Sequence, residues 1–127
     1  MNIIKKRIKI PLYNHLSLVI IISDDVYNAS YDYIGIDNPD KESNARGVFI
    51  SNGGNESILS INPNQKSISD LAGIVSHEAL HATNYIMDFV GMKLSSDSEE
   101  SYTYLLQYIV EEVMNLVEKY KIKYGRD

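Results

Sequence analysis

The sequence contains no cysteine, and this absence excludes two kinds of structure at once. Neither a disulfide framework nor a thiolate metal site can form, so any bound metal has to be held by His, Asp or Glu. Histidine is itself scarce, with three residues in 127. The three are His15, His77 and His81.

Long hydrophobic runs are also missing. The mostly apolar stretch at residues 16–22 is far too short to span a bilayer. With Lys5-Lys6-Arg7 before it, it loosely resembles a secretory signal, but Pro11 interrupts the approach and Ser23-Asp24-Asp25 is a poor cleavage site. We therefore expect two strands here, a cytoplasmic protein and no membrane partner.

Net positive charge is lacking as well, because the formal charge is −5. Apart from Lys5-Lys6-Arg7 the basic residues are scattered along the sequence, which gives no footprint for nucleic acid. A length of 127 residues with 44% hydrophobic content suits one domain with one core. We expect a single domain over residues 1–127 and no nucleic-acid partner.

The first half of the chain has the patterns of strands. Residues 3–12 and 16–23 read as two strands around a turn at Tyr13-Asn14-His15, the second strand being covered on both faces. Residues 24–36 are ambiguous and compatible with a short helix. After a loop at 37–44, two short segments on either side of Asn52-Gly53-Gly54-Asn55-Glu56 have the signature of a β-hairpin.

The second half has the period of helices. Ser67 or Ser69 can cap a helix that runs to about Val90 and stops at Gly91, and a second helix is expected from about Glu99 to Tyr124. The sequence thus predicts an α+β fold, with a small twisted sheet of about four strands packed with two long helices.

The first long helix carries His77-Glu78-Ala79-Leu80-His81, which has the form H-E-x-x-H. Two imidazoles four residues apart lie one turn apart on nearly the same helix face, so each can give one nitrogen to a single metal ion. Glu78 lies beside the first histidine, where it can take a proton from a metal-bound water. Helical stepping places both histidines opposite the apolar stripe, with Glu78 at its edge.

A catalytic zinc ion with two histidines lacks one protein ligand. In the longer H-E-x-x-H-x-x-G-x-x-H pattern that ligand would be a histidine at position 87, but Met87 stands there. Glu99 and Glu100 follow His81 by 18 and 19 residues, at the start of the second helix. Periodicity alone leaves both glutamates open as the third ligand. Asp88, on the histidine face, can either orient His81 or be a solvated acid.

With this motif the chain resembles a gluzincin metallopeptidase of minimal size, in which a glutamate of a following helix completes the H-E-x-x-H zinc site. The run from Ser76 to Ala82 and the segment from Glu100 to Leu105 also resemble small metallopeptidase-like proteins of bacteriophages and prophages. In those proteins an acidic residue, a small residue, an aromatic and then Tyr-Leu open the second helix. This resemblance implies that Glu100 is the third zinc ligand.

The chain departs from thermolysin-like gluzincins in several ways. It lacks their Asn and Ser-Asp around the third ligand, and no histidine follows His81 that could act near the oxyanion. Zinc itself, Tyr102 or Tyr104 would have to stabilise the oxyanion. The resemblance also implies that a strand before the active-site helix pairs with extended peptide, and 47–50 and 58–61 are the candidates.

The sequence therefore predicts a zincin-like zinc metallopeptidase. His77, His81 and Glu100 would hold Zn²⁺, Glu78 would be the general base, and a peptide or protein would be the substrate. Two other hypotheses remain, namely a zinc-stabilised binding module of phage type without turnover and a peptidase that a partner activates. A host cytoplasm is the expected compartment if the protein is phage-encoded.

Overall fold

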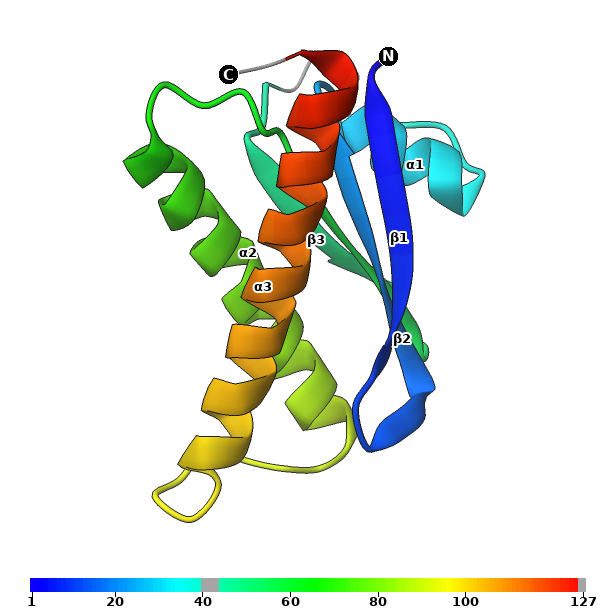
Figure 1. The fold of residues 1–127 in the computed structure, drawn as a ribbon. Helices are drawn as coiled ribbons and strands as arrows, with labels where there is room; N and C mark the ends of the chain where they lie inside the picture. The colour runs from blue at the N-terminus through cyan, green and yellow to red at the C-terminus, as the bar shows by residue number, and fades with distance from the viewer. Residues whose placement is uncertain (40–43, 126–127) are drawn as a thin grey trace.

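A computed structural model describes residues 1–39 and 44–125 of the chain (Figure 1). Part of the loop predicted at 37–44 lies outside the described residues. The elements, in chain order, are β1 (Ile3–Ile10), β2 (Tyr13–Ser23), α1 (Val26–Ile34), β3 (Gly47–Ser51), β4 (Glu56–Ile61), α2 (Ile68–Phe89) and α3 (Glu99–Tyr124). The predicted α+β class, the four strands and the two long helices are confirmed, and the ambiguous segment forms the short helix α1.

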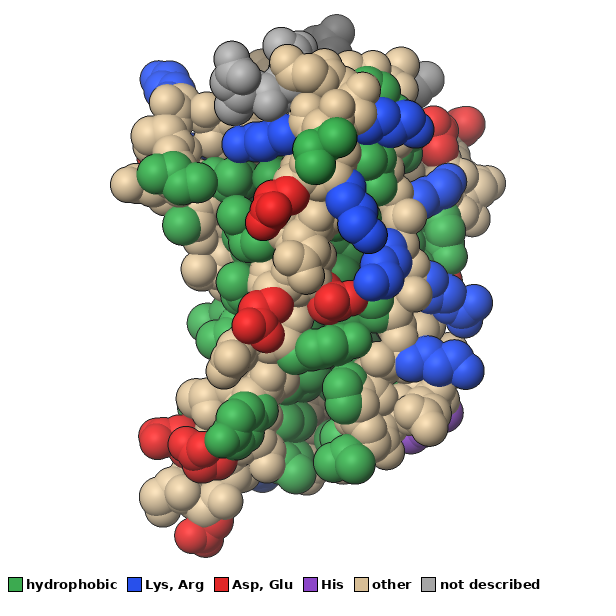
Figure 2. Space-filling model, in the orientation of Figure 1, with side chains coloured by type: hydrophobic (Ala, Val, Ile, Leu, Met, Phe, Trp, Pro, Cys, Tyr) green, Lys and Arg blue, Asp and Glu red, His purple; other side chains and the backbone are tan. Residues whose placement is uncertain are grey.

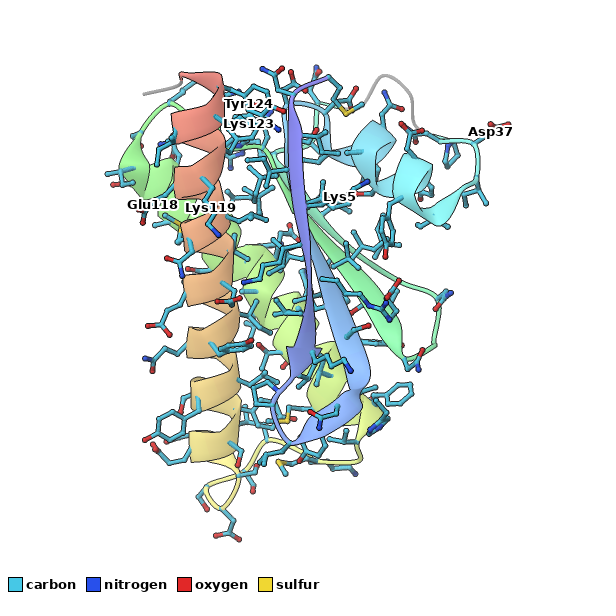
Figure 3. All side chains as sticks on the ribbon, turned by 45° about the vertical axis from the view of Figure 1, so that its right-hand side comes forward. Lys5, Asp37, Glu118, Lys119, Lys123 and Tyr124 are labelled. Atoms are coloured by element: carbon cyan, nitrogen blue, oxygen red, sulfur yellow. The ribbon has the colours of Figure 1, made fainter. Side chains whose placement is uncertain are left out.

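The four strands form one mixed sheet in the order β1-β2-β4-β3. β1 and β2 are antiparallel neighbours, β2 and β4 are parallel, and β3 and β4 form the predicted hairpin. The long helices α2 and α3 cover one face of the sheet, and α1 lies on the other (Figures 1 and 3). β1 and β3 are therefore the two edge strands, and the larger core lies between the sheet and the long helices.

The turn between β1 and β2 differs from the predicted one. Ile10 pairs with Tyr13, so Pro11 and Leu12 form the connection, and Tyr13-Asn14-His15 belong to β2. Proline fixes the φ that the first central position of a tight turn needs, and Leu12 follows with φ of 70°. The prediction was wrong because the polar residues after Pro11 read as turn formers although they lie in a strand.

The strand predicted to be covered on both faces is confirmed. Every residue of β2 from Leu16 to Ser23 is buried. Alternate residues point to the two layers: Leu18, Ile20 and Ile22 contact the core under α2 and α3, whereas Val19 and Ile21 pack in the smaller cluster on the side of α1. A nearly continuous apolar run is what a central strand between two layers requires.

Helix α2 begins at the predicted cap, because the Ser67 hydroxyl accepts a hydrogen bond from the backbone N–H of Asp70 at 3.1 Å. It ends two residues before the left-handed Gly91, whose φ is 79°. Its apolar stripe includes Leu71, Val75 and Ala79, all of which are buried. The opposite face of the helix remains open to solvent.

Basic side chains that are scattered in the sequence gather in the fold. Figure 2 shows them over β1 and the C-terminal part of α3, where β1 carries Lys5-Lys6-Arg7 and Lys9. Lys6 pairs with Glu112 at 2.9 Å and Arg7 with Glu56 at 3.0 Å, so acidic side chains neutralise part of this charge. Charged residues on an edge strand oppose pairing with another strand, which accounts for this arrangement.

Among the described residues, none of the helices has the length and apolar character that a bilayer crossing would require.

Candidate metal centre

The middle of α2 presents the three residues of the H-E-x-x-H motif in two different environments. The His77 side chain is 63% exposed, and His81 is exposed as well, whereas the Glu78 side chain is 8% exposed. The predicted facing of the motif is confirmed, since the histidines lie on the open face of α2 and Glu78 lies at the edge of its buried stripe. The motif thus joins a solvent-accessible pair of imidazoles to a sheltered carboxylate.

The two imidazoles already converge. Nε2 of His77 and Nε2 of His81 are 3.3 Å apart, with the rings nearly perpendicular at 74°. A carboxylate oxygen of Glu78 lies 3.9 Å from Nε2 of His77. One potential ligand atom from each of the three residues lies within 4.8 Å of the others, so the group can hold a metal ion. Within residues 1–39 and 44–125 it is the only such group of three or more side chains.

Burial changes the acidity of Glu78. Removal of the carboxylate from water raises its pKa above the ordinary value of 4.5, and the neighbouring His77 and His81 counteract this in part. A carboxylate with a raised pKa accepts a proton more readily, which is the property that a general base working near neutral pH needs. Glu78 therefore combines a sheltered position beside His77 with a raised pKa.

Gly47, the first residue of β3, permits this burial. A Cβ built at Gly47 would lie 2.9 Å from Cγ1 of Ile74 and 3.0 Å from Cγ of Glu78. The strand backbone therefore lies against the side of α2 that carries Glu78. Gly47 was not among the predicted site residues. A glycine that opens an otherwise apolar strand was the available signal, because it often marks a close approach of backbone.

The structure does not bring Glu100 or Glu99 into the group. Both are exposed in the first turn of α3, which lies at the end of the molecule where α2 terminates (Figure 1). His81 precedes the end of α2 at Phe89 by eight residues, which is about 12 Å along the axis. Neither glutamate contributes an atom to the cluster formed by the motif.

The other candidate residues also lie apart from the cluster. Asp88 is exposed and follows His81 by seven residues, or about 10 Å along the axis, so direct orientation of His81 does not occur here. His15 is an exposed residue of β2. The Tyr102 hydroxyl donates a hydrogen bond to the carbonyl of Met92 at 2.7 Å, and Tyr104 is 68% exposed on α3.

The two segments considered for pairing with an extended peptide are now distinguished. β4, which contains residues 58–61, is hydrogen-bonded to β2 and β3 and has no free edge, whereas β3 has a strand on one side only. β3 also runs along the side of α2 that carries Glu78. Gly47 lies beside Glu78, and two residues on, the Phe49 ring lies 5.7 Å from the ring of Tyr85.

Comparison with known proteins adds no relative to this picture: no protein-family model matches the chain, and neither a curated protein nor a solved structure shows significant similarity to it.

Proposed function

We propose that the protein is a zincin-like zinc metallopeptidase, with His77 and His81 as metal ligands and Glu78 as general base. The observation that carries the proposal is the separation of 3.3 Å between the two Nε2 atoms. Two nitrogens bound to tetrahedral zinc at about 2.05 Å are about 3.3 Å apart. The same distance also suits a hydrogen bond between the two ring nitrogens when one carries a proton and the other does not, and in a metal site both nitrogens would act as ligands.

The chemistry of the donors also suits zinc. Imidazole is a preferred zinc ligand, and both rings are accessible to solvent, which leaves positions for water and substrate. When bound, the metal would polarise the substrate carbonyl and acidify a coordinated water. Glu78 is placed to hold the proton of that water and to pass it to the leaving amine, and its sheltered position under β3 excludes bulk water from the carboxylate.

The two edges of the sheet differ in a way that supports an extended peptide substrate. β1 has four basic residues, which oppose strand addition, whereas β3 has the uncharged sequence Gly-Val-Phe-Ile-Ser. The unprotected edge is the one that runs beside the motif. An extended peptide that pairs with β3 would pass the metal and Glu78.

The test is substitution of Glu78 by Gln in zinc-loaded protein, assayed on a fluorogenic peptide library. We expect Glu78→Gln to retain one zinc per chain and to lower kcat by about 10²- to 10⁴-fold, because the amide cannot accept the proton. His77→Ala serves as the control that loses metal and activity together. Undiminished peptide cleavage by Glu78→Gln would exclude the role of general base.

A second candidate function is a zinc-stabilised binding module without turnover. Its support is the exposure of both histidines, which allows a partner side chain to complete the coordination shell. The two functions differ in the remaining coordination positions, which hold water in an enzyme and a protein group in a closed structural site. X-ray absorption of the zinc-loaded protein, free and with a partner, separates them.

A further inference from the structure

We infer that one end of the molecule binds the surface of a lipid bilayer that carries anionic headgroups. The last turns of α3 and the first turn of α2 lie at this end (Figure 1). We call it the basic end, and its residues are four lysines and two isoleucines, none of them buried: Lys66, Ile68, Lys119, Lys121, Ile122 and Lys123. The inference is independent of the proposed function, because none of these residues belongs to the group of His77, Glu78 and His81.

Two sets of contacts join the basic end to its neighbours in one surface. Lys121 lines a hollow together with Lys66 and Ile68, so the end of α3 meets the start of α2 there. At the last turn of α3, the Tyr124 hydroxyl donates a hydrogen bond to the carbonyl of Ile3 at 3.1 Å and accepts one from the N–H of Ile3 at 3.3 Å. These bonds fix the last turn of α3 to β1.

The two isoleucines of the basic end project into water. Ile122 is 83% exposed and Ile68 is 68% exposed. A single exposed aliphatic side chain is ordinary on a protein surface, so exposure by itself indicates no ligand. Here, however, Ile122 lies on one stripe of α3 with Lys119 and Lys123, and Ile68 follows Lys66 by two residues. Aliphatic side chains among lysines are typical of surfaces that lie in the headgroup region of a bilayer.

The charge of the basic end is opposite to that of the whole chain. Residues 66–70 and 118–124 contain four lysines and two acidic residues, Asp70 and Glu118, so their formal charge is +2, whereas the chain has −5. Lys119 and Lys123 lie close together in Figure 3, with Lys5 beyond them on β1. None of the four lysines makes an ion pair within the described part of the chain. Their charges are therefore available to anionic headgroups.

Neither the helix dipole nor the edge of the sheet explains the two isoleucines. Lysines in the last turn of α3 complement the dipole of that helix, and lysines on β1 protect an edge strand. Neither requirement calls for an aliphatic side chain in water between lysines. Isoleucine is also a weaker helix former than the lysine and glutamate residues that are common on exposed helix faces.

The aliphatic side chains favour a bilayer over a nucleic acid. Lysines contact the phosphates of either partner. Nucleic-acid surfaces add aromatic side chains on which bases stack, whereas the acyl boundary of a bilayer takes aliphatic ones such as Ile68 and Ile122. The sequence predicts no membrane partner because its apolar run is too short to cross a bilayer, but binding at the surface of a bilayer requires no crossing segment.

The test measures binding of the full chain to unilamellar vesicles by flotation, in EDTA so that no metal contributes. One set of vesicles is phosphatidylcholine alone, and the other contains phosphatidylcholine and phosphatidylserine in about equal parts. We expect binding to the mixed vesicles to be at least about tenfold tighter than to phosphatidylcholine and to weaken as salt is added. Equal binding to both kinds of vesicle, or to neither, would overturn the inference.

Matched variants localise the contact. Lys119→Gln combined with Lys123→Gln should weaken binding to the mixed vesicles by about 25-fold, since each lysine near the surface contributes about fivefold. Ile122→Ser should weaken it by about tenfold, because a large aliphatic side chain is no longer removed from water. Lys93→Gln and Leu94→Ser make the same kinds of change at exposed residues between α2 and α3, at the other end of both helices, and should leave binding unchanged.

Two further outcomes would also overturn the inference. Control variants that weaken vesicle binding as much as the variants of the basic end would show adsorption without a defined surface. Labelled oligonucleotides, single-stranded and duplex, are measured in parallel by fluorescence anisotropy. Oligonucleotide binding that depends on Lys119 and Lys123 but not on Ile122, without preference for the mixed vesicles, would assign the basic end to nucleic acid. A cooperative thermal transition in each variant shows that a loss of binding is not a loss of fold.

Discussion

Gly47 determines how closely β3 approaches the middle of α2. A methyl group there would contact Ile74 and Glu78 at about 3 Å, a distance that forces either side chain to move. We expect Gly47→Ala to destabilise the fold by about 1–3 kcal/mol through overpacking and to lower the proposed peptidase activity by displacing Glu78. Urea unfolding and kcat measured on the same preparation check both effects.

Gly73 provides the matched control for this substitution. It lies on the exposed face of α2, and a Cβ there would meet nothing within 4 Å. Gly73→Ala should stabilise the protein by about 1 kcal/mol, because alanine has the higher helix propensity. Equal changes in the free energy of unfolding for Gly47→Ala and Gly73→Ala would show that β3 does not pack closely against Glu78.

The raised pKa of Glu78 predicts that the stability of the folded protein depends on pH. Burial favours the protonated carboxyl in the folded state, so the stability of the metal-free protein should fall as the pH rises from 4.5 through the raised pKa. The Glu78→Gln variant has no titrating group at this position, so it lacks this contribution to the pH dependence of stability. We expect the variant to be the more stable protein at pH 7, with the advantage lost near pH 4. Denaturation of both proteins in EDTA at pH 7 and at pH 4 measures this difference in stability. A stability advantage of the variant that does not change with pH would refute the assigned burial of Glu78.

At the scale of elements, the sequence predicted what depends on local pattern. The cap at Ser67, the end of α2 before Gly91, the hairpin at Asn52–Glu56 and the extent of α3 all follow from residues near in the chain. The parallel pairing of β2 with β4 does not, because it joins segments some forty residues apart. Periodicity could place both histidines on an open face, but it could not show that β3 covers Glu78.

The position of α3 explains why the structure differs from the prediction for Glu100. Spacing along the chain allowed a return to the predicted metal, but α3 begins at the end of the molecule where α2 terminates (Figure 1), and Glu100 contributes no atom to the group of His77, Glu78 and His81. We expect Glu100→Ala and the matched Glu99→Ala to change zinc affinity by less than about twofold. Chelator competition measures it. A loss confined to Glu100→Ala would show that metal binding moves α3 and would restore the predicted ligand.

At the scale of the whole molecule, the candidate metal site lies outside the core, because both histidine side chains are exposed. The buried apolar side chains between the sheet and the long helices do not include either histidine. The metal-free protein should therefore remain folded, unlike a small zinc finger. Zinc at a hundredfold excess over its Kd should still add about 2.7 kcal/mol through binding to the folded state alone. Calorimetric Tm values with EDTA and with zinc check this, and loss of cooperative unfolding in EDTA would contradict it.

The most direct measurement is a zinc titration of the metal-free protein, compared with that of His81→Ala. If the two imidazoles bind one ion, the wild type should bind one zinc ion per chain. The His81→Ala variant should bind zinc at least about a hundredfold more weakly, because it has lost one of two strong ligands. Equal zinc affinity of the two proteins would mean that the metal is held elsewhere, and the assignment of His77, Glu78 and His81 as a catalytic group would be wrong.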